Sequence, residues 1–200
     1  IMIQRNAKRL LNLVNQLLDF RRMEFQEVTL NPSEGDIVSF IHETTNSFSD
    51  LSEKKHVQLT FTSTIQALET FFDKDKLEKI LFNLLSNAFK FTPESGKVEV
   101  RLDLVEVSDN PARWLELKVL DTGIGIPEEK LDKVFDRFFQ LDVPNSMVNQ
   151  GSGIGLSITR EFVKAHKGTI SVTSEVNKGS CFTVLLPVQE IHEHQEVMHG

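Results

Sequence analysis

Three polar side chains in an otherwise apolar stretch are the first residues able to do chemistry. The segment FNLLSNAFKFT (82–92) carries Asn83, Asn87 and Lys90. In a helix of about 100° per residue, Asn87 lies roughly 40° from Asn83 and Lys90 lies roughly 20° to its other side, so the three form one stripe. The apolar residues fall on a broad neighbouring face: Leu77, Ile80, Leu81, Leu84, Leu85 and Ala88. A helix that buries one side beside two amides and an ammonium group needs a polar partner for that stripe.

Asp121 begins a second candidate segment, DTGIGIP (121–127). It stands at the end of a predicted strand, directly before Gly123 and Gly125. Glycines let the backbone pass close to a flat ligand, and the carboxylate can accept a hydrogen bond. The pattern suits a flat group that carries an exocyclic amine.

A second glycine run, GSGIGLS (151–157), opens a predicted helix. The free backbone N–H groups and the positive end of the helix dipole favour a phosphate there. Each glycine cluster alone is a weak signal, because glycine-rich turns are common, and the two together are a stronger one. The sequence has no G-x-x-x-x-G-K-[ST], and GSGIG lacks the spacing of a dinucleotide site, which excludes P-loop and Rossmann interpretations.

The elements that must position these residues alternate between helical and strand periods. Helices are predicted at 37–54, around the polar stripe, within 127–140 and at 156–167. Strands are predicted at 57–63, 69–72, 97–107, 114–121, 168–175 and 181–187, with antiparallel hairpins across 108–113 and 177–179. Glycines flank a segment at 123–155 that we expect to be mobile. The order predicts an α+β domain with one mixed sheet covered on one face by helices and more exposed on the other.

The N-terminal segment 1–24 reads as a bundle helix. Its apolar residues recur at alternating spacings of four and three: Ile3, Ala7, Leu10, Val14 and Leu17. Two such heptads are too short to fold alone, so the seam needs partner helices from outside the chain or from a second copy. The predicted domain organisation therefore has three parts: this helical segment at 1–24, a main domain at 25–188 and a linker at 189–200.

Composition limits the classes of function. The chain of 200 residues has 40% hydrophobic and 26% charged residues, which is typical of a globular protein. Its net charge of -7 argues against nucleic-acid binding. No apolar run reaches the length of a membrane span and the N-terminus has no signal peptide, so a cytoplasmic domain is expected. The single cysteine, Cys181, is interpreted as a small core residue.

Four segments in order resemble the N, G1, F and G2 boxes of the histidine-kinase catalytic domain: FNLLSNAFKFT, DTGIG, VFDRFFQ and GSGIGLS. The resemblance covers about residues 30–188. The family belongs to the superfamily of gyrase, chaperone, kinase and mismatch-repair ATPases. The resemblance implies a two-layer α/β sandwich of the Bergerat type, with a mixed sheet, helices on one face and one long N-terminal helix before it. It also implies a pocket for ATP closed by a lid at 128–150.

The resemblance assigns roles to the polar stripe. Asn87 would give its side-chain oxygen to Mg²⁺, a hard ion that prefers oxygen ligands. Lys90 would meet phosphate, and Asn83 would assist at the metal or the phosphates. All three are candidate catalytic residues, and Asn87 and Asn83 are the candidate metal ligands.

The other boxes would hold the rest of the nucleotide. Phe91 would lie against the adenine and Asp121 would accept from its amino group. Gly123 and Gly125 would allow close approach, and Ile126 would line the base pocket. The G2 amides would cradle the phosphates: Gly151, Ser152, Gly153, Ile154, Gly155 and Leu156.

Asn83 distinguishes between branches of the superfamily. The gyrase-like and chaperone ATPases that the chain resembles carry a Glu four residues before the metal-binding Asn, as a base for water. An amide cannot take a proton from water at neutral pH, so phosphoryl transfer to a protein is favoured over hydrolysis. Many kinases of the family carry a basic residue where this chain has Gln140. Arg137 is therefore a candidate catalytic residue that would contact the γ-phosphate. The alternative is that it forms an ion pair with an acidic neighbour on the lid.

The phospho-acceptor histidine is missing. Residues 1–24 resemble the second helix of the hairpin that carries it, while His42 is interpreted as a partly exposed helix residue. We interpret the tail histidines as part of a solvated linker: His192, His194 and His199.

The resemblance implies a fragment of a sensor histidine kinase that does not autophosphorylate alone. The implied partners are the hairpin of the same or a sister subunit, a response-regulator receiver domain, and a second copy in a homodimer. A hybrid parent protein would carry the receiver domain in the same chain. The parent would be an inner-membrane sensor. A degenerate nucleotide-binding regulatory module and an autonomous ATPase of the gyrase or chaperone type are the alternative functions.

Overall fold

The computed structural model describes four parts of the chain, residue 14 and residues 28–107, 110–141 and 152–188. Within them, no helix has both the length and the apolar character needed to cross a membrane. Three predicted features lie almost wholly outside the described residues and stay predictions: the N-terminal helix, the tip of the lid with Gly151, and the C-terminal linker.

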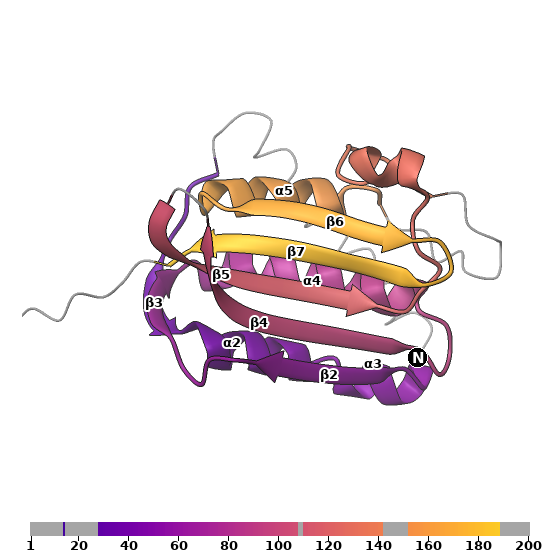
Figure 1. Cartoon of the computed structure of the whole chain (residues 1–200), viewed down its shortest axis with the longest axis horizontal. Helices are drawn as coiled ribbons and strands as arrows, with labels where there is room; N and C mark the ends of the chain where they lie inside the picture. Colours follow the sequence, from indigo (N-terminus) through magenta and orange to yellow (C-terminus); the bar gives the residue numbers. More distant parts are fainter. Residues whose placement is uncertain (1–13, 15–27, 108–109, 142–151, 189–200) are drawn as a thin grey trace, which may run out of the picture.

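A five-stranded sheet forms one layer, in the order β2-β4-β5-β7-β6 (Figure 1). The strands are β2 (Gln58–Ser63), β4 (Lys97–Val107), β5 (Asn110–Asp121), β6 (Thr169–Glu175) and β7 (Gly179–Pro187). β2 runs parallel to β4, and every other pair in this sheet is antiparallel. The predicted mixed sheet and both predicted antiparallel pairs are confirmed, although β5 begins at Asn110, within the turn predicted at 108–113.

Four helices cover one face of this sheet and lie behind it in Figure 1. They are α2 (Ile37–Asn46), α3 (Ser49–Lys55), α4 (Lys74–Phe91) and α5 (Gly155–Ala165). Alternate strand residues point into the core between the layers, as the period of a strand requires: Val98, Val100, Leu102, Leu115, Leu117 and Val119. The predicted α+β sandwich with helices on one face is confirmed.

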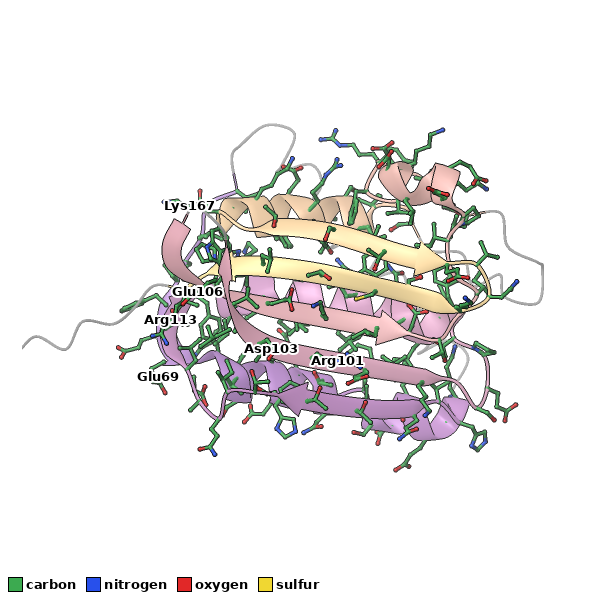
Figure 2. The ribbon with its side chains drawn as sticks, viewed as in Figure 1. Glu69, Arg101, Asp103, Glu106, Arg113 and Lys167 are labelled. Carbon is green, nitrogen blue, oxygen red and sulfur yellow. The ribbon has the colours of Figure 1, made fainter. Side chains whose placement is uncertain are left out.

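The opposite sheet face is polar. Figure 2 shows Arg101 and Asp103 on β4, which alternate with the buried core residues of that strand. Arg101 is exposed, and its Nε donates to Glu99 at 2.6 Å. The expectation of a more exposed second face is met on this strand.

Helix α4 has well-defined ends. The buried Asp73 is its N-cap and accepts from the backbone N–H of Lys76 at 3.0 Å. At the other end, both the N–H and the hydroxyl of Thr92 donate to the carbonyl of Ala88, and Pro93 follows. A proline has no N–H for a helix and restricts the residue before it, so the helix stops just after the polar stripe.

The prediction of one continuous helix over 37–54 is wrong, because this segment forms two helices, α2 and α3. Near the break, the hydroxyl of Thr45 donates to Ile41 and that of Ser47 donates to Thr44. Such side-chain bonds offer the helical carbonyls alternative partners. Phe48 then turns inward and stacks on Phe89 with 5.8 Å between ring centroids.

Two further differences concern short segments. A strand, β1 (Ser33–Asp36), pairs with β3 (Glu69–Phe72) as a separate two-stranded ribbon, where the sequence indicated only a helix start. The predicted helix within 127–140 is a single 3₁₀ helix, η1 (Glu128–Lys133). Its turn bonds join residues three apart, and Phe138 has a left-handed φ of 62°, which is incompatible with a continuing helix.

Candidate functional site

The end of α4 lies directly against the G1 loop (121–127). The carbonyl oxygen of Phe91 accepts from the N–H of Ile124 at 3.3 Å. The ring of Phe91 is half-buried, and the Lys90 ammonium nitrogen lies 4.7 Å from its centroid. An aromatic face and a cation are therefore held next to the loop that begins with Asp121.

Asp121 is a partly buried acceptor at the end of β5. Its Oδ1 accepts from the N–H of Gly123 at 2.8 Å, and the backbone of Ser180 on β7 also donates to the carboxylate. Burial raises the pKa of Asp121 from 3.8 to about 6, although both hydrogen bonds lower it. Ile126, the predicted wall of the base pocket, is only 6% exposed. The loop thus offers a carboxylate beside an apolar side chain.

Asn83 joins the polar stripe to the second glycine run. Its side-chain nitrogen donates to the carbonyl of Gly155 and to the hydroxyl of Thr159, each at 3.2 Å. The Thr159 hydroxyl itself donates to Gly155 at 3.0 Å. The N-box helix and the start of α5 are therefore adjacent, although 72 residues separate them in the chain.

Asn87 lies one turn further along α4, toward the G1 loop. Its side chain is half-buried and has no hydrogen-bond partner among the described residues. An amide oxygen without a protein partner is the kind of ligand that Mg²⁺ takes together with substrate phosphates and water. The chemistry of this position fits a magnesium ion, whereas the amide nitrogen of Asn83 is already engaged with α5.

The start of α5 is open to an anion. Its N-cap, Ile154, makes no side-chain cap hydrogen bond, and the backbone N–H of Ile154 donates to the hydroxyl of Ser152 at 3.3 Å. The first N–H groups of a helix have no intrahelical partner, so they favour an anion when no cap occupies them. Gly153, Gly155 and Leu156 belong to the same turn, as the sequence predicted.

The F box contacts this turn through its backbone. The N–H of Phe138 donates to the carbonyl of Gly153 at 2.9 Å, and its ring is 63% exposed. Phe135 is buried and meets Phe182 of β7 edge-on, with 6.2 Å between centroids. A residue within the predicted lid is thus bonded to the glycine turn that follows the lid, and Arg137 lies exposed between these aromatic residues.

Sequence reasoning missed three residues at this site. Thr159 lies one turn after Gly155 on α5, and its helical spacing was the available signal. Ser174 and Gly179 belong to the β6–β7 hairpin, which contacts the G1 loop. Only the glycine in the turn NKGS gave a hint, since the neighbouring loop is more than 50 residues away in the sequence.

The sheet topology and the contact between the N-box helix and α5 define a catalytic domain of the histidine-kinase ATPase class. A family profile described as "Histidine kinase-, DNA gyrase B-, and HSP90-like ATPase" matches residues 72–190, and the chain belongs to this family.

Similar proteins agree with this assignment. The chain is 40% identical over 186 residues to sensor histidine kinase TmoS of Ectopseudomonas mendocina, covering 93% of this chain and 18% of that protein. It is 35% identical over 195 residues to histidine kinase P4 of Formosa agariphila, covering 96% of this chain and 14% of that protein. Among solved structures, full-length ShkA in complex with AMPPNP superposes with a TM-score of 0.78 at 26% identity, covering 94% of this chain and 37% of ShkA. The chain therefore spans less than a fifth of these two curated relatives.

Proposed function

We propose that the chain binds ATP with Mg²⁺ and transfers the γ-phosphoryl group to a histidine on a hairpin helix that is not part of the chain. The observation that carries the proposal is the bond from Asn83 to Gly155, which holds the polar stripe of α4 beside the open start of α5. A relative crystallised with an ATP analogue, AMPPNP, supports the choice of nucleotide.

The base would be held at the G1 loop. Asp121, in its ionised form, accepts from the exocyclic amine of adenine, and Ile126 covers the ring from the apolar side. Phe91 lies against the adenine. Because the carboxylate is partly buried, its hydrogen bond to the base is less weakened by water than at the surface and discriminates against bases without the amine.

The triphosphate would lie between α4 and the start of α5. The free N–H groups of α5 donate to phosphate oxygens, and Lys90 adds a positive charge. Asn87 holds Mg²⁺ through its side-chain oxygen, and Asn83 keeps the two helices in register. When bound, the metal neutralises charge on the phosphates.

The same residues disfavour hydrolysis. Asn83 occupies the place of a base, and its nitrogen donates to two acceptors on α5. An amide cannot accept a proton from water at neutral pH. The site therefore positions and neutralises the phosphoryl group, while the nucleophile comes from another domain.

The partners follow from this chemistry. The first is the phospho-acceptor hairpin of the same or a sister subunit in a homodimeric parent protein. The second is a response-regulator receiver domain, which accepts the phosphoryl group from the histidine. The names of two relatives, histidine kinase P4 and sensor histidine kinase TmoS, support the histidine-kinase class of the parent protein. We further propose that the parent protein is anchored in the inner membrane.

The test is a transfer assay with γ-labelled ATP, the chain, and a separately produced hairpin bearing the acceptor histidine. We expect acid-labile label on the hairpin with the wild type and with Glu78→Ala, a control on the exposed side of α4, and none with Asn87→Ala. ATP binding without any transfer would contradict the proposal and favour a regulatory module. Steady phosphate release by the chain alone would favour an autonomous ATPase.

A further inference from the structure

One carbonyl in the last turn of α4, that of Phe89, cannot find a partner within the helix. In an α-helix it would accept from the N–H four residues later, but that residue is Pro93, which has no N–H. The ammonium group of Lys55, at the end of α3, donates to this carbonyl at 2.6 Å. Phe89 is buried, so its carbonyl would be costly to leave unpaired. Lys55 thus supplies the bond that the proline removes.

This turn carries two of the proposed nucleotide contacts. Lys90 and Phe91 directly follow Phe89, and the Lys90 ammonium nitrogen lies 4.7 Å from the centroid of the Phe91 ring. The backbone has only two soft dihedrals per residue, so the orientation of the peptide at Phe89 limits where the next two side chains point. The bond from Lys55 therefore acts on the groups proposed to meet phosphate and adenine.

The corner between α3 and β2 holds Lys55 in place. Its neighbour His56 is the left-handed C-cap of α3, and the carbonyl of His56 accepts from the N–H of Ser95 at 2.8 Å. The N–H of Gln58 donates to the carbonyl of Gly96 at 2.9 Å. Both partners lie in the turn that follows α4, so this corner and the end of α4 form one hydrogen-bonded unit.

The turn after α4 is also bonded to the G1 loop. The N–H of Lys97 donates to the hydroxyl of Thr122 at 2.9 Å, and the N–H of Thr122 donates to the carbonyl of Lys97 at 3.0 Å. Lys55 thus stands at one end of a series of hydrogen bonds that runs from α3 to the loop that begins with Asp121.

The charge of Lys55 matters as well, because the negative end of α4 lies at this turn. The C-terminal end of a helix carries a partial negative charge, which disfavours the phosphates of a nucleotide. The Lys55 ammonium group places a positive charge directly on a C-terminal carbonyl, and Lys90 is a second cation in the same turn. Lys55 therefore both orients this turn and offsets its unfavourable charge.

We propose that Lys55 is a positioning residue for the nucleotide, which holds Lys90 and Phe91 in place by capping α4 at the Phe89 carbonyl. This inference rests on the proposed nucleotide site. Lys55 lies outside the four boxes that carry the resemblance, and it acts through the end of α4 without touching the nucleotide.

The test is a calorimetric titration of ATP with Mg²⁺ on single variants of the chain. Lys55→Met keeps the length of the side chain but has no donor, so we expect ATP affinity to fall about fivefold. Lys55→Arg keeps a donor and the charge and should stay within about twofold of the wild type. Lys54→Met is the matched control, because it removes the same charge from an exposed neighbour and should also stay within about twofold. Equal losses in Lys54→Met and Lys55→Met would show a long-range charge effect and overturn the inference.

Hydrogen exchange separates positioning from overall stability. The N–H groups of Thr92 and Ile124 donate to carbonyls of the last turn of α4. We expect both to exchange at least about threefold faster in Lys55→Met than in Lys54→Met, while the N–H groups of β7 stay unchanged.

Thermal unfolding checks that each variant is folded. If Lys55→Met does not fold, Lys55→Gln takes its place, because its amide is one bond too short to occupy the position of the ammonium group. Wild-type ATP affinity and wild-type exchange in a folded variant without the Lys55 donor would overturn the inference. Failure of the wild type to bind ATP at all would instead overturn the proposed function.

Discussion

At the scale of single residues, Asp121 has the most informative environment. Its pKa is raised from 3.8 to about 6 because the carboxyl is buried. A carboxyl with a raised pKa binds its proton more tightly in the folded protein. Its contribution to stability is therefore fully present below about pH 4 and is lost as the pH rises through about 6.

The first prediction concerns this loss. Between pH 4 and pH 7, the free energy of unfolding of the wild type should fall by about 2 kcal/mol relative to that of Asp121→Asn, because the full effect of the shift is about 3 kcal/mol and part of it is already lost at pH 4. Urea denaturation of both proteins across this range measures the difference, and other titrating groups cancel in it. Curves that stay parallel would show that the carboxyl is not perturbed.

The same titration should control binding. Ionised Asp121 is the stronger acceptor for an amine, so ATP affinity should rise between pH 5 and pH 7 and level off above the pKa of this carboxyl. Titrations of inosine triphosphate are the control, because its base offers no amine and should show no such rise. A rise of equal size for both nucleotides would place the titrating group at the phosphates instead.

Substitution of Asn83 and of Asn87 should change the free energy of unfolding by different amounts. Asn83→Ala removes two hydrogen bonds between α4 and α5, so we expect the free energy of unfolding to drop by about 2 kcal/mol. Asn87→Ala removes no bond among the described residues and should change it by less than about 0.5 kcal/mol. Equal losses in urea denaturation would contradict this division between a positioning amide and a ligand amide.

At the scale of elements, α4 carries the site, and its start is tied to the segment that enters the domain. The buried Asp73 accepts from Lys76 at the first turn and also from the N–H of Asn31 at 2.8 Å. Asp73→Ala should therefore destabilise the protein by about 2 kcal/mol, at the upper end of the range for a lost helix cap. Asp75→Ala is the control, because its ion pairs are exposed and contribute less than about 1 kcal/mol. Similar losses in the two variants would contradict the role given to Asp73.

An element could be predicted from the sequence when its own residue pattern is enough to specify it, and not when it depends on partners far away in the sequence. Periodic apolar residues were enough for α4, and strict alternation was enough for β4 and β5. The ribbon of β1 and β3 could not be predicted, because its pairing joins segments more than 30 residues apart and β1 is four mostly polar residues. The break between α2 and α3 depends on local hydroxyl bonds that a hydrophobic pattern does not report.

At the scale of the whole molecule, the site is assembled from segments spread between residues 83 and 180. Their types and order, together with the resemblance, predict which residues face a nucleotide, and the fold brings α4, the G1 loop and the start of α5 together. The hydrogen bonds among them were beyond sequence reasoning. Asn83 donates to a backbone carbonyl, and the hairpin meets the G1 loop through backbone groups that leave no side-chain pattern.

The net charge of the chain bears on how a nucleotide could bind. The net charge of -7 repels a polyanionic nucleotide at long range, so the proposed function requires that affinity come from Lys90, the free N–H groups of α5 and a bound cation. The central claim is that Asn87 binds the cation, because this contact would link the polar stripe of α4 to the phosphoryl transfer.

Calorimetric titration of ATP, with Mg²⁺ and with EDTA, tests this claim most directly on the wild type and on Asn87→Ala. We expect Mg²⁺ to tighten ATP binding to the wild type at least tenfold, and to leave binding to a folded Asn87→Ala unchanged. An equal gain from Mg²⁺ in both proteins would contradict the assignment of the stripe as the metal and triphosphate face.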